Sequence, residues 1–214
     1  VNDDLLIDLG PDLLTSANAA RKYLGNLKGL LVTHQHSDHW LPQNLYWRKP
    51  GFTPTAMVPL TVYGPADALS DLSPDLADSA HFTWQVVTAG DRWTVGDATI
   101  TAIPATHGGG YLEPLLYVIE REGRKLFYST DTAPYREPAW DLLRGLGPMD
   151  LIVLDATAGK LSGGDGHHGM EQFLATRARM IEEGVLRPGL TKMVAHHFSH
   201  NGGMTHDELV EAYG

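Results

Sequence analysis

Cysteine is absent from this chain of 214 residues. Without thiols, these residues can build neither a disulfide framework nor a thiolate metal site. Any metal ion bound by them must therefore be held by nitrogen and oxygen atoms. Such donors suit Zn and Mn, and also Fe or Ni.

Long apolar runs and basic residues are both scarce. No stretch approaches the roughly 20 consecutive apolar residues that span a bilayer, so we expect a soluble, cytoplasmic protein with no membrane partner. The 16 basic residues are outnumbered by 26 acidic ones, which gives a formal net charge of -10. A net-acidic surface repels polyanions unless a local basic patch overrides it, so we do not expect a nucleic-acid substrate.

The length and the hydrophobic content of 43% are sufficient for one domain with a sizeable core. We therefore predict a single domain over residues 1–214. The apolar stretch Leu5–Leu9 resembles the second strand of a hairpin, and the chain stops directly behind a predicted helix. We expect the chain to be trimmed at one or both ends, and a homodimer stays open as its assembly.

Short apolar runs bounded by Gly, Pro and Asp alternate with helical patterns, which is typical of mixed α and β layers. Apolar residues at helical spacing predict a helix over about Met170–Glu183, and Thr205-x-x-Glu208 is the capping box of another. The predicted strands are Leu5–Asp8, Leu30–Thr33, Thr61–Tyr63, Phe82–Val87, Arg92–Val95, Thr99–Pro104, Leu115–Glu120, Lys125–Ser129, Leu151–Leu154 and Met193–Ala195.

Histidine is unusually frequent, and eight of the eleven histidines lie in three clusters, at 34–39, 167–168 and 196–200. His34, His107, Asp131 and His196 each lie just beyond a predicted strand. Side chains at strand ends can converge on one edge of a sheet. The sequence therefore predicts one site, with the Gly-rich segment 159–169 and its two histidines as a mobile cover.

The HQHSDH segment can send alternate side chains to two neighbouring metal ions, which a carboxylate can bridge. Asp131 follows a strand and is the natural bridge. A chance surface cluster or a single structural zinc is the alternative, but three histidines and an aspartate in six residues behind an apolar strand argue against it. From this chemistry we assign His34, His36 and His107 to one ion, Asp38, His39 and His197 to the other, and Asp131 to both.

LVTHQHSDHW resembles the defining motif of the metallo-β-lactamase superfamily, with His107, Asp131 and His197 at fitting separations. The resemblance covers nearly the whole chain. It implies an α+β fold, a four-layer αββα sandwich, with two divalent metal ions at one edge. It also implies a metal-bridging hydroxide as nucleophile, which Asp38 orients. Asp131 replaces the cysteine of true β-lactamases and so favours the phosphodiesterase and hydrolase branches.

Within the superfamily, IDLGPDL, LDATAG, the GHH segment and VAHHFSH look most like the phosphoribosyl cyclic phosphodiesterase of the carbon-phosphorus lyase pathway and its relatives. This resemblance places the acid that protonates the leaving oxygen at His167, with His168 as the neighbouring candidate. His196 is the alternative to His197 as the last ligand. Some relatives build a structural zinc from N-terminal cysteines and the residue here numbered His200, and no cysteine is present to do so.

The predicted function is a metal-dependent phosphodiesterase that acts on small, including cyclic, phosphodiesters. A lactonase or thioesterase-type hydrolase on the same metals is one alternative. A tRNA 3'-processing endonuclease is another, although no basic RNA-gripping insertion is visible, and a binding module without activity would require lost ligands. The sequence leaves two roles undecided. Asp155 is either a turn residue or a carboxylate that orients a histidine, and His200 either forms a hydrogen bond near the site or only packs.

Overall fold

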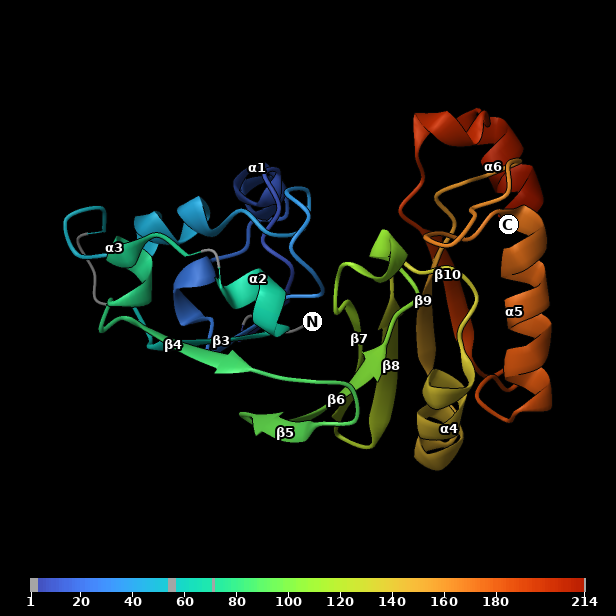
Figure 1. Cartoon of the computed structure of the whole chain (residues 1–214), viewed down its shortest axis with the longest axis horizontal. Helices are drawn as coiled ribbons and strands as arrows, with labels where there is room; N and C mark the ends of the chain where they lie inside the picture. The colour runs from blue at the N-terminus through green and yellow to red at the C-terminus, as the bar shows by residue number, and fades with distance from the viewer. Residues whose placement is uncertain (1–3, 54–56, 71, 214) are drawn as a thin grey trace. The chain divides into compact units, whose positions relative to one another are not determined.

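The computed structural model describes residues 4–53, 57–70 and 72–213, which fall into two compact units. The first unit contains the described residues up to 88 together with 94–96, and the second contains 89–93 and those from 97 onward. Each unit has its own sheet and helices (Figure 1). The predicted mixed fold of strands and helices is confirmed. None of the helices in the described ranges has both the length and the apolar character needed to cross a membrane.

The first unit is built on a four-stranded parallel sheet in the order β1-β2-β3-β4. Its strands are short and mostly apolar, with Leu the most frequent residue, as expected for parallel strands. One core forms around Leu30, Val62, Leu45 and Trp40. The elements are β1 (Leu5–Ile7), α1 (Leu13–Ala19), η1 (Leu24–Asn26), β2 (Gly29–Leu31), η2 (Pro42–Arg48), β3 (Leu60–Gly64), α2 (Ala66–Ser70), α3 (Pro74–Ala77) and β4 (Phe82–Val86).

β1 is the end strand of this sheet. It pairs in parallel with β2, and in the described part of the chain no strand pairs with its other side. The expectation that Leu5–Leu9 pairs with a strand outside these residues stays a prediction.

The larger sheet has the order β10-β9-β8-β7-β6-β5, antiparallel from β6 to β8 and parallel from β8 to β10. Helices α4 and α5 lie along one face of it (Figure 1). The elements are β5 (Arg92–Val95), β6 (Ala98–Pro104), η3 (Gly108–Gly110), β7 (Leu115–Arg121), β8 (Arg124–Ser129), α4 (Glu137–Leu146), β9 (Leu151–Asp155), α5 (Met170–Glu182), β10 (Lys192–His196), η4 (His200–Gly202) and α6 (His206–Tyr213).

The core of the second unit lies between this sheet and the two helices. Phe127 and Ile152 of the sheet pack with Trp140 and Leu143 of α4 and with Met180 of α5, and all five are buried. The last helix begins at its predicted capping box, because Thr205 N donates to Glu208 Oε2 at 2.8 Å. This core carries the strand ends from which the polar residues of the next section project.

We expect Leu143→Ala to lower the free energy of unfolding by about 2–5 kcal/mol, because it leaves a cavity in this core. Leu190→Ala is the matched control, since Leu190 is 69% exposed and Leu143 is 0% exposed. The control should stay within about 0.5 kcal/mol of the parent protein. Urea denaturation measures both, and equal losses would contradict the described core.

Candidate metal centre

The polar residues of the second unit converge because three parallel strands end together. Ser129 of β8 is in register with Leu154 of β9, and Asp155 is in register with His196 of β10. The residues at or just beyond these ends therefore meet at one edge of the sheet. Asp131, Asp155 and His197 come from these strand ends, and His167 comes from the segment before α5; each offers a ligand atom within 4.8 Å of the others.

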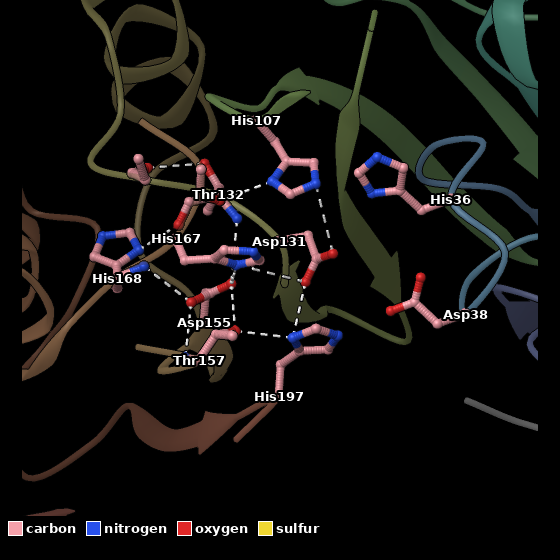
Figure 2. A network of polar contacts seen from close by, with 12 residues as sticks. His36, Asp38, His107, Asp131, Thr132, Asp155, Thr157, His167, His168 and His197 are labelled. Carbon is pink, nitrogen blue, oxygen red and sulfur yellow. Dashed lines mark hydrogen bonds and ion pairs between the residues drawn. The ribbon is translucent and has the colours of Figure 1, made fainter. Parts of the chain in front are cut away.

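Asp155 is the centre of this group (Figure 2). Its side chain is fully buried, yet five donors surround it. Oδ1 accepts from the backbone N–H groups of Thr157 and His168, both at 3.0 Å. Oδ2 lies 3.3 Å from Thr132 N, 3.2 Å from Thr157 Oγ1 and 3.0 Å from His167 Nδ1. The carboxylate thus orients a histidine, the role that the sequence left open.

His197 lies beside Asp131 and Thr157. Because the Thr157 hydroxyl donates to Asp155, it accepts from His197 Nδ1, 2.8 Å away. Asp131 Oδ1 lies 2.9 Å from the same nitrogen. The proton is therefore on Nδ1, and Nε2 carries the lone pair that a metal needs. His196 is exposed at the end of β10, so the structure brings His197 and not His196 to Asp131.

His107 is held in the same tautomer. Its Nδ1 donates to the carbonyl oxygen of Gly166 at 2.8 Å, and its Nε2 lies 3.8 Å from Asp131 Oδ2. Gly166 belongs to the Gly-rich segment that we expected to cover the site. A side chain at Gly163 of that segment would overlap the carbonyl oxygen of His167. At Gly163 the absence of a side chain permits a close backbone contact.

His167 lies between two predicted ligands. Its ring is in edge contact with that of His107, with centroids 4.9 Å apart, and it stacks parallel to that of His197 at 6.0 Å. Its side chain is 28% exposed, and its Nδ1 donates to Asp155. Proton transfer to another group therefore falls to Nε2.

His168 differs from His167 although the two are adjacent. It is fully buried, its Nδ1 lies 2.6 Å from Thr132 O, and its Nε2 lies 2.9 Å from Thr176 Oγ1. Burial lowers the pKa of this imidazole, and the charge of Asp155 opposes that shift. These contacts favour His167 over His168 as a proton donor.

The first unit holds a corresponding group beyond β1 and β2. Ile7 is in register with Leu31, so Asp8 and Thr33 lie just past two parallel strand ends. Asp8 accepts from Thr33 N at 2.8 Å, from Thr33 Oγ1 at 3.0 Å and from His39 Nδ1 at 2.7 Å. Burial raises the pKa of the Asp8 carboxyl, and the contacts with His39 and Thr33 oppose this shift.

Asp8 also sets the tautomers of two histidines. The Thr33 hydroxyl donates to Asp8 and therefore accepts from His34 Nδ1, 3.0 Å away, while His39 Nδ1 donates to Asp8 directly. In both rings Nε2 therefore carries the lone pair. His34 Nε2 lies 3.0 Å from His36 Nδ1, and His39 Nε2 lies 3.6 Å from Asp38 Oδ2. These paired nitrogen and oxygen donors fit a divalent ion.

Backbone conformation marks the same residues. Among the described residues, five that are not glycine have positive φ, and three of them belong to these groups: Asp8 at 60°, Asp131 at 53° and His197 at 63°. Left-handed backbone is uncommon for residues with a side chain and clusters at functional sites. This strain is evidence for function that is independent of the donor chemistry.

Sequence reasoning did not identify Asp8, Thr33, Thr132 or Thr157 as site residues. Asp8 stands in IDLGPDL and Thr157 in LDATAG, both of which contributed to the resemblance. An acidic residue at the end of an apolar strand was the available signal. It could not reveal which histidine each carboxylate would contact.

Comparisons with known proteins identify the family of this chain. A model of the beta-lactamase superfamily domain matches residues 4–198, across both units. The chain belongs to this superfamily. It is a metal-binding hydrolase with the metallo-β-lactamase fold, as the sequence resemblance implied.

Two solved structures resemble the present chain over most of its length. The metallo-β-lactamase fold protein YhfI from Bacillus subtilis has a TM-score of 0.72 and 17% identity, with 99% of this chain and 81% of that chain covered. A diphosphatase from the PhnP family has a TM-score of 0.70 and 20% identity, with 95% and 72% covered. At these identities the likeness shows the fold.

A curated relative is the exodeoxyribonuclease YycJ of Bacillus anthracis, 27% identical over 125 residues. The match spans 57% of the present chain and 42% of YycJ, which is less than half of the length of YycJ. A match of this extent does not transfer the activity of YycJ to this chain.

The hydrogen bond from His34 to Thr33 can be tested with a matched pair of variants. Thr33→Val keeps the shape of the side chain but removes the hydroxyl, whereas Thr33→Ser keeps the hydroxyl. Loss of a contact that orients a ligand histidine typically weakens metal binding by about 10–100-fold. We expect that loss for zinc in Thr33→Val, measured by competition with a chromophoric chelator, and near-parental binding in Thr33→Ser. Equal affinities of the two variants would contradict the tautomer assignment of His34.

Proposed function

We propose that this chain is a dinuclear metal-dependent phosphodiesterase that hydrolyses small phosphodiesters, including cyclic ones. The proposal keeps the ligand assignment that was made from the sequence. It assigns His34, His36 and His107 to one ion, Asp38, His39 and His197 to the other, and Asp131 to both. Support comes from the superfamily, from the donor types and from the fixed tautomers of four of these histidines.

Two divalent ions, Zn or Mn and with Fe or Ni as further candidates, would supply Lewis acidity and lower the pKa of a water molecule. The chain supplies the remaining functions. Asp8 and Asp155 hold imidazole rings in the tautomer that places the lone pair on Nε2. Asp38 is exposed and lies beside His39, a position from which it would orient the attacking water.

The observation that carries the proposal is the contact between His167 and Asp155, next to His107 and His197. A carboxylate at Nδ1 stabilises the imidazolium form and fixes the ring orientation. His167 Nε2 can then donate a proton to the oxygen that leaves phosphorus. An alkoxide has a high pKa and needs such a proton, so this geometry suits esters with poor leaving groups.

The activities of two relatives support a phosphoryl substrate over a carboxylic ester. One is a diphosphatase and the other an exodeoxyribonuclease. The net charge of -10 opposes a long polyanion, which is why we propose a small substrate. The second candidate, a lactonase or thioesterase, uses the same metal ligands.

A direct assay separates these candidates. Protein reconstituted with Zn or Mn is offered an aryl phosphodiester, an alkyl cyclic phosphodiester, a lactone and single-stranded DNA. We expect hydrolysis of the two small phosphodiesters and two ions per chain by elemental analysis. Turnover of the lactone alone, or one ion at full loading, would contradict the proposal.

The variant His167→Ala tests the proton donor. General acid catalysis typically contributes about 10²–10⁴-fold, so turnover of alkyl phosphodiesters should fall by about that factor. Turnover of p-nitrophenyl phosphodiesters should fall much less, because nitrophenolate leaves without a proton. Metal content should stay at the parental level.

His81→Ala is the matched control, because His81 is an exposed histidine outside both donor groups. It should leave both activities unchanged. Equal losses on the two substrates in His167→Ala would show that the residue positions the substrate. Loss of metal in that variant would show that His167 is a ligand, as its place among four donors within 4.8 Å also permits.

A further inference from the structure

The contacts of His168 show which of its two ring nitrogens carries a proton. Its Nδ1 lies 2.6 Å from the carbonyl oxygen of Thr132, and a carbonyl oxygen only accepts. The proton must therefore be on Nδ1. Nε2 then accepts from the Thr176 hydroxyl at 2.9 Å. Both nitrogens are used within the protein, and burial, which lowers the pKa of this ring, favours the neutral tautomer with its proton on Nδ1.

Thr132, the residue that His168 holds, follows Asp131 in the chain and is itself fully buried. Its backbone N–H donates to Asp155, and its hydroxyl accepts from the N–H of Thr106 at 3.0 Å while donating to Ala133 O. His168 binds the remaining group, the carbonyl oxygen. Every polar group of Thr132 is thus held at a fixed position.

Asp131 needs such support because its backbone lies in the left-handed region, with φ of 53°. A conformation of this kind in a residue with a side chain costs of order 1–3 kcal/mol and persists only where its surroundings determine it. The Thr132 carbonyl belongs to the next residue, so its hydrogen bond restrains how the chain leaves Asp131. That restraint limits the backbone angles open to Asp131 and therefore the directions in which its carboxylate can point.

We propose that His168 is a positioning residue that fixes Asp131 through the carbonyl of Thr132 and transfers no proton. The inference rests on the proposed role of Asp131 as a shared metal ligand. It assigns different tasks to two adjacent histidines. It also connects α5, which carries Thr176, to the carboxylate that both ions need.

Two amide substitutions separate the two sides of the His168 ring. The side-chain amide nitrogen of asparagine occupies about the place of histidine Nδ1, and that of glutamine about the place of Nε2. His168→Asn therefore keeps the donor to Thr132, whereas His168→Gln loses it. Thr176→Val is a third variant, which removes only the hydrogen bond at Nε2.

The readout is the zinc dissociation constant, measured by chelator competition, together with the melting temperature of the metal-free protein. We expect His168→Gln to bind zinc about 10–100-fold more weakly, the range for lost outer contacts of a metal site. His168→Asn and Thr176→Val should bind zinc with near-parental affinity even where their melting temperatures fall. This separation of affinity from stability is not expected of a residue that only packs.

Three outcomes would overturn the inference. The first is a fall in melting temperature for all three variants with unchanged zinc affinity. The second is an equal loss of affinity in His168→Asn and His168→Gln. The third is parental zinc affinity in His168→Gln with a selective loss of alkyl phosphodiester turnover, which would make His168 the acid. A parental protein that binds no divalent metal would instead refute the proposed function, and the metal titration alone distinguishes that case.

Discussion

The hydrogen bonds of two buried aspartates fix the orientation and tautomer of four histidines in the candidate centre. Each aspartate accepts one imidazole directly and a second through a threonine hydroxyl. Each stands at or just past the end of a strand with a parallel neighbour, so its partners arrive from adjacent strand ends. The two sets are Asp8 with His39, Thr33 and His34, and Asp155 with His167, Thr157 and His197.

Burying an ionised carboxylate costs several kcal/mol unless donors replace its water. Here the replacement donors are the same groups that bring metal ligands into position. A metal requires a neutral imidazole with a free lone pair, so each proton given to a carboxylate or threonine at Nδ1 prepares Nε2. The same hydrogen bonds therefore replace the water around each aspartate and hold the ligand histidines in place. This explains why each aspartate is so buried and yet so fully surrounded by donors.

The sequence predicted the strands well and the helices less completely. All ten predicted strands are present, shifted at their ends by at most two residues, because short apolar runs between turn residues are an unambiguous signal. Among the longer helices, α1 was not predicted, and its Thr, Ser and Asn are weak helix formers; α4 was not predicted either, although its Pro138 fits a first helical turn. Asp8 was missed, and the role of Asp155 was left open, because their function lies in contacts between segments distant in sequence.

Two pairs of adjacent histidines show most clearly that a sequence motif does not reveal which of its residues enters the site. His196 continues the alternation of β10 and faces outward, and the left-handed turn at the next residue directs His197 to Asp131. His167 is partly exposed and can exchange a proton with its surroundings, whereas His168 could do so only by breaking a buried hydrogen bond. In both pairs the residues have the same chemistry and differ only in backbone direction and burial. A constellation of histidines in sequence therefore predicts that a centre exists, and the backbone at each strand end decides which of them can take part.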